Sequence, residues 1–217
     1  MDLTQFSPSS ALVTVILLAL APFVAVMVTS FTKIVVVLSL LRNALGVQQT
    51  PPNLVINGLA MVLSIYVMYP IGQQVMDEIS LMEDVGKDTS SLLAAANVAK
   101  EPMREFLVKH AESREREFFL KTIQKMLPAD KASEVKADDF IVIVPAFTIS
   151  ELTVAFKIGF LIFLPFIIID LVISNILMAM GMMMLSPTTI SLPFKLLLFV
   201  LIDGWIKLAH GLVLTYV

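Results

Sequence analysis

The chain has 217 residues, of which 58% are hydrophobic and only 15% are charged, and its mean hydropathy is +0.89. A typical soluble domain has about 25% charged residues, so these values argue against an ordinary soluble globular protein and against a disordered chain. The formal net charge of −3 lacks the basic excess of a nucleic-acid binder, and we expect no nucleic-acid partner. The absence of cysteine excludes disulfides, thiolate metal sites and thiol catalysis.

Charge is unevenly distributed and divides the sequence into three parts. Residues 77–139 carry 24 of the 33 charged residues, whereas the flanking segments, 1–76 and 140–217, carry only nine between them. We therefore predict two hydrophobic regions around one polar insert, in an all-α, membrane-associated protein. Segments of 18 or more apolar residues are long enough to cross a bilayer as helices.

The polar insert is predicted to be helical, with a solvated charged face. A helix is expected to start near Pro102 and to end at Pro128, and a second, shorter helix is possible over 131–136. Its apolar stripe has helical spacing and consists of Met103, Phe106, Leu107, His110, Phe118, Phe119, Ile123 and Met126.

Hydropathy alone predicts four membrane-spanning segments, over 11–30, 54–71, 158–185 and 196–217. Basic residues favour the cytoplasmic side in short loops. We expect Lys33 and Arg42 to lie between the first two segments and Lys195 between the last two. This pattern places the short loops in the cytoplasm, with the insert and both termini outside.

Prolines recur inside the hydrophobic parts, so we expect bent or broken helices rather than straight spans, at least around Pro145 and Pro165. The residues Ala19, Leu20 and Ala21 resemble a signal-peptide cleavage site. However, no Lys or Arg precedes them, so we expect no cleavage.

Chemistry-bearing motifs are absent from the sequence. His110 and His210 are the only histidines, and neither has a second ligand three or four residues away. No glycine-rich phosphate loop or nucleophile elbow occurs. The Asp138–Asp139 pair is interpreted as a helix cap or a solvated turn. We expect no enzymatic activity, no metal and no cofactor.

Charges within the hydrophobic segments are costly in lipid, and they usually face protein or water. Asp203 and Lys207 are four residues apart and can pair along one helix face. The charges without such a local partner are Glu151, Lys157, Asp170 and Lys195. Structural pairing inside a bundle or between subunits is the favoured interpretation. The alternative is a small-solute or ion transporter in which carboxylates such as Asp170 and Glu151 form a relay.

Residues 178–184 read MAMGMMM and contain five of the 13 methionines. Three consecutive methionines cannot all be buried by one helix face, and Gly181 before them and Pro187 after them indicate a loop or a helix break. Two interpretations remain open here. The segment is either a soft part of the core or a flexible, apolar loop that seals an opening.

Five stretches of the sequence together resemble a known family. They are LRNALGVQQTPPN (41–53), PAFTISELTVAFKIGF (145–160), LPFIIIDLVISN (164–175), MAMGMMMLSP (178–187) and LPFKLLLFVLIDGW (192–205). The chain resembles the export-gate family of bacterial type III secretion, called SctR, YscR or HrcR in injectisomes and FliP in flagella. Gln48 and Gln49 before the proline pair resemble the injectisome branch.

The resemblance implies a non-enzymatic, pore-forming subunit at the bacterial inner membrane, built from bent helical hairpins with the insert on the periplasmic side. It implies a homopentamer that binds SctS-type and SctT-type proteins, other export components, lipid and unfolded secreted substrates. The methionines Met182, Met183 and Met184 match the family's pore gasket. Glu151 and Lys195 match charges that pair between neighbouring subunits.

Overall fold

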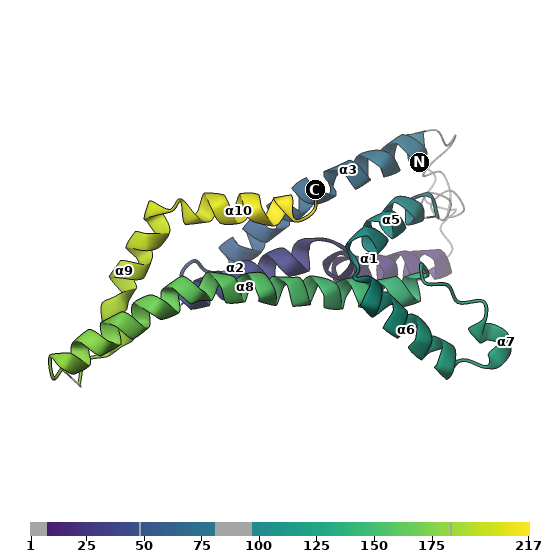
Figure 1. The fold of residues 1–217 in the computed structure, drawn as a ribbon. Helices are drawn as coiled ribbons and strands as arrows, with labels where there is room; N and C mark the ends of the chain where they lie inside the picture. Colours follow the sequence, from purple (N-terminus) through teal and green to yellow (C-terminus); the bar gives the residue numbers. More distant parts are fainter. Residues whose placement is uncertain (1–7, 48, 81–96, 183) are drawn as a thin grey trace. The chain divides into compact units, whose positions relative to one another are not determined.

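A computed structural model describes residues 8–47, 49–80, 97–182 and 184–217 (Figure 1). These residues are helical and contain no strand, which confirms the predicted all-α class. Gln48, which helped to indicate the injectisome branch, and Met183 of the expected gasket lie outside the described residues. The helices are α1 (Pro8–Val28), α2 (Phe31–Leu45), α3 (Asn53–Ser80), α5 (Lys100–His110), α6 (Ser113–Met126), α7 (Ala129–Ala132), α8 (Phe140–Ala179), α9 (Pro187–Leu201) and α10 (Gly204–Leu214).

The chain folds into two compact units, and both are assembled from segments that are distant in the sequence. The first unit comprises the described residues of 1–30 and 68–151, and the second comprises those of 31–67 and 152–217. Two long helices, α3 and α8, contribute residues to both units. The division into 1–76, 77–139 and 140–217 by composition remains a prediction about sequence segments.

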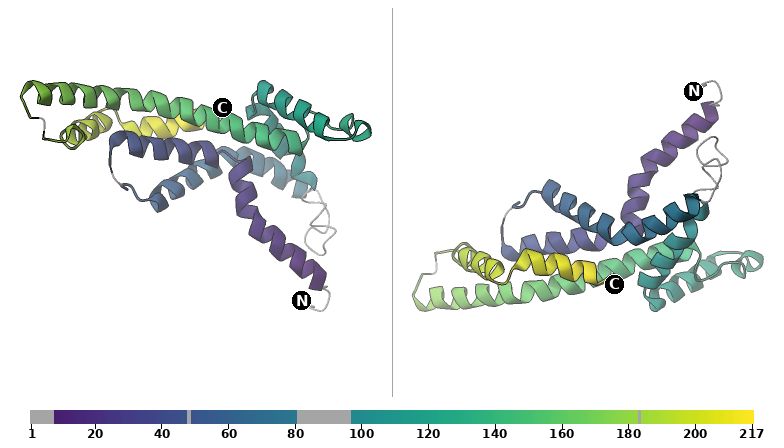
Figure 2. Two further views of the ribbon diagram at one scale, coloured as in Figure 1. Left: turned by 90° about the horizontal axis from the view of Figure 1, so that it is seen from below. Right: turned by 90° about the horizontal axis from the view of Figure 1, so that it is seen from above.

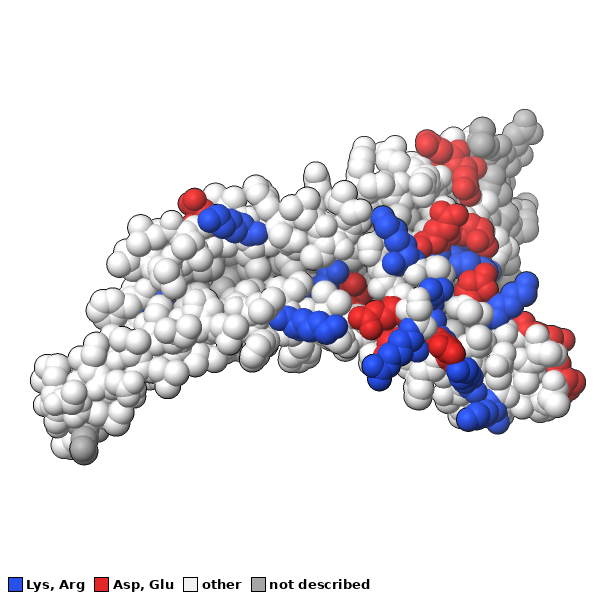
Figure 3. All heavy atoms as spheres, in the orientation of Figure 1, with Lys and Arg blue, Asp and Glu red and all other residues white. Residues whose placement is uncertain are grey.

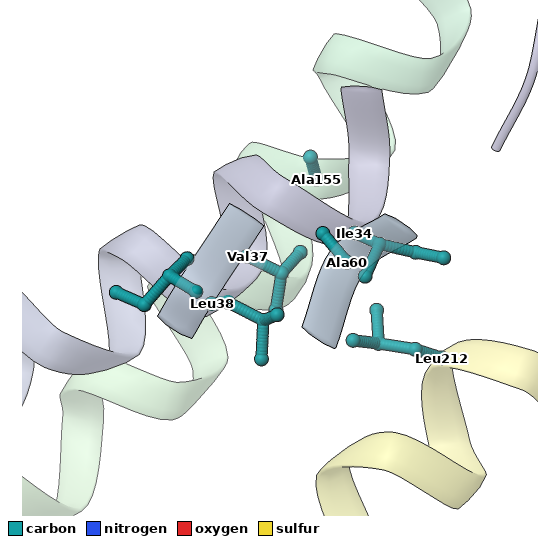
Figure 4. Packing of buried hydrophobic residues seen from close by; sticks show 7 residues of the cluster. Ile34, Val37, Leu38, Ala60, Ala155 and Leu212 are labelled. Atoms are coloured by element: carbon teal, nitrogen blue, oxygen red, sulfur yellow. The ribbon is translucent and has the colours of Figure 1, made fainter. Parts of the chain in front are cut away.

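The core of the second unit forms around one face of α2. Ile34, Val37 and Leu38 are 0–1% exposed, and their spacing places them on one side of the helix. They pack with Ile56 and Ala60 of α3, Ala155 of α8 and Leu212 of α10 (Figure 4). Four helices thus share one apolar cluster. A second cluster, formed by Leu41, Ala44, Leu45, Phe166 and Phe199, connects α2 with α8 and α9.

A glycine allows α2 and α8 to approach closely. A Cβ atom added at Gly159 of α8 would lie 2.2 Å from the Cδ1 atom of Leu40 in α2, closer than two carbon atoms can pack. The absence of a side chain at Gly159 therefore makes room for the Leu40 side chain. By contrast, a Cβ atom at Gly58 of α3 would meet no atom within 4 Å.

The first unit is organised around the packing of α5 against the start of α8. The rings of Phe106 in α5 and Phe147 in α8 lie 5.6 Å apart, and both side chains are buried. The Arg104 guanidinium lies 5.2 Å from the Phe140 ring and pairs with Asp138 at 3.5 Å. The latter contact agrees with a structural role for the Asp138–Asp139 pair.

The insert is helical as predicted, but it contains an additional break. Pro102 lies in the first turn of α5, and Pro128 ends the helical segment after α6, both as expected. The single expected helix is interrupted at Glu112, whose backbone N–H donates to the Ser150 hydroxyl at 2.9 Å. The short helix α7 covers Ala129–Ala132 rather than 131–136.

Charged side chains gather over α5, α6 and the start of α8 on the face shown in Figure 3, whereas α9 and the second half of α8 are almost free of charge. No side chain of α6 is buried. On this helix, a hydrogen bond from Lys121 and the charge of its ammonium lower the pKa of the Glu117 carboxyl. These observations agree with a solvated charged face.

Among the described residues, two helices, α3 and α8, are each long and apolar enough to cross a membrane. The number rises to four if Pro22–Val28 with α2, and α9 with α10, each count as one bent span. Bent or broken helices are expected around Pro145 and Pro165, and the structure has no break there, because α8 continues through both prolines. Each proline removes only one backbone donor from a helix of 40 residues. The breaks in the described residues occur instead at Ser30 and Asp203.

The orientation in the membrane was predicted from three basic residues in short loops, and two of them do not lie in loops. Lys33 and Lys195 are not loop residues, because they lie within α2 and α9 and are only 3% and 4% exposed. Only Arg42 is near a short connection. It donates to the Pro51 carbonyl and to the Asn53 side chain, and thereby joins the end of α2 to the start of α3. The basic residues therefore give little information about the orientation in the membrane.

Candidate functional site

The methionine-rich segment forms the connection between α8 and α9, at one end of the second unit (Figures 1 and 2). The helix α8 ends in a Schellman motif, in which the N–H of Met182 donates to the Leu177 carbonyl at 2.9 Å and the N–H of Gly181 donates to the Met178 carbonyl at 3.0 Å. Gly181 has a φ of +74°, which a residue without a side chain adopts at little cost. The helix break that the sequence indicates at Gly181 is therefore the end of α8.

The helix α9 begins directly after this connection. Pro187 occupies its first turn, where the missing N–H has no intrahelical partner to lose. The Ser186 hydroxyl lies 2.9 Å from the Thr188 hydroxyl. The connection is thus short and closed at both ends by residues suited to helix termini.

The described methionines of this connection are accessible in the single chain. The exposed fraction is 42% for Met182 and 101% for Met184, while Met178 and Met180 at the end of α8 are more than half exposed. These four side chains therefore lie outside the core of the single chain, and the seal remains a prediction. A cluster of exposed thioether side chains at a helical turn is available to contact other molecules.

A buried ion pair connects the two helices that flank the methionine connection. The Nζ atom of Lys195 in α9 lies 2.6 Å from the Oδ2 atom of Asp170 in α8. The other carboxylate oxygen of Asp170 accepts a hydrogen bond from the hydroxyl of Ser191, which is fully buried. These three residues hold α8 and α9 together through polar contacts on the charge-poor side of the chain.

The two partners of this ion pair differ in burial. The side chain of Lys195 is 5% exposed, whereas that of Asp170 is 32% exposed. A Cβ atom at Gly46, in the connection after α2, would lie 3.8 Å from the Lys195 Nζ atom. The ammonium group is therefore enclosed by three segments of the second unit and depends on Asp170 for charge compensation.

The other predicted site residues are placed differently. Glu151 is 2% exposed in α8 and has an interaction within the chain. Asp203 is the residue before α10, and the Lys207 N–H donates to its carbonyl at 3.0 Å. However, Asp203 has a φ of +54°, so its side chain does not take the direction of a helical residue. The expected ion pair between Asp203 and Lys207 is wrong, since these two described side chains do not pair. The helix break at Asp203 explains the difference.

The contacts of two residues, Lys33 and Ser191, could not be read from the sequence. The Lys33 ammonium lies 3.6 Å from the centre of the Tyr216 ring, so a buried cation of α2 contacts the C-terminal segment. Ser191 was not singled out, although its hydroxyl contributes to the Asp170 site. An isolated lysine in an apolar run and a serine four residues before Lys195 were the available signals.

Among the described residues, no group of three His, Asp or Glu side chains is arranged to hold a metal ion. In the second unit, Lys195 and Ser191 of α9 instead contact Asp170 of α8, and these polar contacts join the two helices. Together with long apolar helices, exposed methionines and a buried ion pair, this arrangement defines a helical membrane protein.

The chain belongs to the FliP family, whose family model matches residues 13–212. It is 53% identical to Pathogenicity-related ORF2 of Xanthomonas campestris pv. glycines over 208 residues, which cover 96% of each chain. It is 51% identical to the hypersensitivity response secretion protein HrcR of Ralstonia nicotianae, over 96% of this chain and 97% of the relative. It is 54% identical to the Yop proteins translocation protein R of Yersinia pestis, over 92% of each chain. The family resemblance inferred from the sequence motifs is confirmed.

Proposed function

We propose that the chain is a structural, pore-forming subunit of a type III secretion export gate in the bacterial inner membrane. The names of the relatives, which refer to secretion and translocation, support a role in protein export. In this proposal, five copies form a ring with SctS-type and SctT-type proteins and other export components. Unfolded secreted proteins pass through the ring, and the chain itself catalyses no reaction.

The exposed methionine connection between α8 and α9 is the observation that carries this proposal. Met182 and Met184 extend from a short connection whose ends are fixed by a Schellman motif and by Pro187. In a ring of copies, Met182, Met183 and Met184 would form a narrow apolar gasket. Thioether side chains resist wetting, and their rotatable bonds let the gasket open around different polypeptides and close again.

The Asp170 site favours a structural role over an ion relay. Its carboxylate is occupied by the Lys195 ammonium and the Ser191 hydroxyl, and this contact joins the two helices that carry the gasket. We infer that the pair keeps the angle between α8 and α9 constant while the connection itself opens and closes. A relay would instead need a carboxylate that exchanges its partner.

The proposal also includes a contact between subunits, from Glu151 of one copy to Lys195 of the next. The Lys195 ammonium has three donors, of which one reaches Asp170, so further acceptors can bind. Both side chains are almost fully buried in the single chain. A contact between copies therefore requires local rearrangement during assembly.

For the membrane arrangement, we propose that the polar insert, 77–139, lies on the periplasmic side between two hydrophobic regions, 1–76 and 140–217. The concentration of charge in the insert supports a position in water. The bend between α9 and α10 agrees with a hairpin that is not a simple straight span.

The experiment is a leakage measurement in cells that carry an altered gasket. Replacing Met182, Met183 and Met184 together by Ala shortens the gasket side chains and should raise the uptake of a small impermeant solute. The control is Met126→Ala, which shortens an exposed methionine of α6. If leakage stays at the wild-type level in a normally assembled complex, the gasket assignment is wrong.

A further inference from the structure

A second surface of the molecule has features of a ligand site that the export role does not use. An open groove of about 350 Å³ lies between α8 and α10 within the second unit. Ile158, Leu161 and Ile162 line it from α8, Lys207 and Gly211 line it from α10, and Thr215 lines it directly after α10. The helix α10 runs back toward the start of α8 (Figures 1 and 2).

The groove is apolar and unfilled along its length. A Cβ atom at Gly211 would meet no atom within 4 Å, so the glycine leaves space that a larger side chain would occupy. Leu161 on the opposite wall is 64% exposed. The helix α8 is a candidate membrane span, and α10 is part of a bent one. The groove is therefore a channel for an apolar chain on a surface that can face lipid.

The one charged residue that lines the groove is Lys207. Its side chain is exposed and, within the part of the chain that the structure describes, it has no ion-pair partner. The carboxylate of Asp203, one turn earlier, forms no ion pair with it. A lysine at a membrane surface extends its apolar stem along hydrocarbon and brings its ammonium to the headgroup region.

We propose that this groove binds an anionic phospholipid, with an acyl chain between α8 and α10 and the headgroup phosphate on the Lys207 ammonium. An apolar channel lined by a single cation is complementary to one acyl chain with one negative headgroup. A helix of a second protein would fill the channel equally well, but it would have to supply an acidic side chain to Lys207. The phospholipid satisfies both requirements at once.

The test is native mass spectrometry of the purified full-length protein, with phosphatidylglycerol as the anionic probe and phosphatidylcholine as the zwitterionic one. The wild-type protein should retain phosphatidylglycerol in preference to phosphatidylcholine. Lys207→Gln should weaken that binding about fivefold, because a lysine near an anionic headgroup contributes about this much. The matched control is Lys157→Gln. This substitution removes an exposed lysine that lies in α8 and does not line the groove.

Filling the groove tests the position of the acyl chain. Gly211→Leu should abolish retention of phosphatidylglycerol, whereas Gly58→Leu adds the same side chain to an open position of α3 and should leave it unchanged. If Gly211→Leu loses helicity by circular dichroism, Leu161→Trp fills the groove from the opposite wall and should have the same effect.

Three results would overturn the proposal. The first is equal retention of both lipids by the wild type, and the second is unchanged retention in Lys207→Gln or in the groove-filling variants. The third is a disulfide between two copies that carry Gly211→Cys, formed in place of lipid retention, because it would make the groove a protein contact. The first two readouts are lipid binding and the third is a disulfide, so failure here is distinguishable from failure of the leakage experiment.

Discussion

The ion pair between Asp170 and Lys195 predicts an asymmetric response to neutralisation. In Asp170→Asn, the Lys195 ammonium remains buried, with a side-chain exposure of only 5%, and loses its charge partner. Removing one partner of a buried pair costs about 3–5 kcal/mol. In Lys195→Met, the remaining carboxylate is 32% exposed and keeps the Ser191 hydroxyl, so we expect a loss of only about 1–2 kcal/mol.

The assay is thermal unfolding of the purified full-length protein in detergent. For a chain of this size, 1 kcal/mol shifts the melting temperature by about 2–4 °C. Asp170→Asn should therefore lower the melting temperature by about 10 °C, and Lys195→Met should lower it by about 4 °C. The double variant Asp170→Asn with Lys195→Met has no unpaired charge and should be more stable than Asp170→Asn alone.

Two outcomes would refute this reasoning. If Lys195→Met destabilises the protein as much as Asp170→Asn, the burial of the remaining charge does not determine the loss of stability. If the effects of the two substitutions add in the double variant, the residues are not energetically coupled, and the pair does not hold α8 to α9.

Three further predictions concern other contacts. Gly159→Leu should lower the free energy of unfolding by about 1–3 kcal/mol, because no space exists for a side chain; unchanged stability in denaturant titration would contradict this packing. Tyr216→Leu should cost about 1–2 kcal/mol through loss of the aromatic ring over Lys33, whereas Tyr216→Phe should cost less; equal losses in the same titration would exclude a cation–π contribution. Reversing the charge of Glu151 or Lys195 alone should reduce the yield of assembled complex by native electrophoresis. Because a carboxylate at position 195 would also face Asp170, the double reversal is made together with Asp170→Asn and should restore part of the yield; a combined variant as defective as the sum of the separate changes would disprove pairing between subunits.

The helical class and the apolar segments were predictable, because hydrophobic runs and helical spacing are local properties of the sequence. The break before α9 was also predictable, since Gly181 and Pro187 act on the backbone within a few residues of their own positions. The uninterrupted course of α8 through Pro145 and Pro165 was not, because the loss of one hydrogen bond is offset by the rest of a long helix.

The polar contacts of the second unit depend on tertiary packing and could not be found from spacing. Asp170 and Lys195 are 25 residues apart, and only the turn between α8 and α9 brings them together. The Asp203–Lys207 pair was predicted from a spacing of four residues, which holds only inside a helix. Because Asp203 adopts a left-handed conformation before α10, that geometry is lost.

The most direct test of the proposed pore is disulfide formation between neighbouring copies at the methionine connection. The chain has no cysteine, so Met184→Cys introduces a single thiol, and Met126→Cys places an equally unique thiol on an exposed position of α6. If the connections of several copies meet around one axis, mild oxidation of the assembled complex should convert the Met184→Cys chain into covalent dimers, because their Cα atoms can approach to disulfide distance. Covalent dimers no more abundant for Met184→Cys than for Met126→Cys, in a complex that assembles normally, would contradict the proposal that this connection closes the pore.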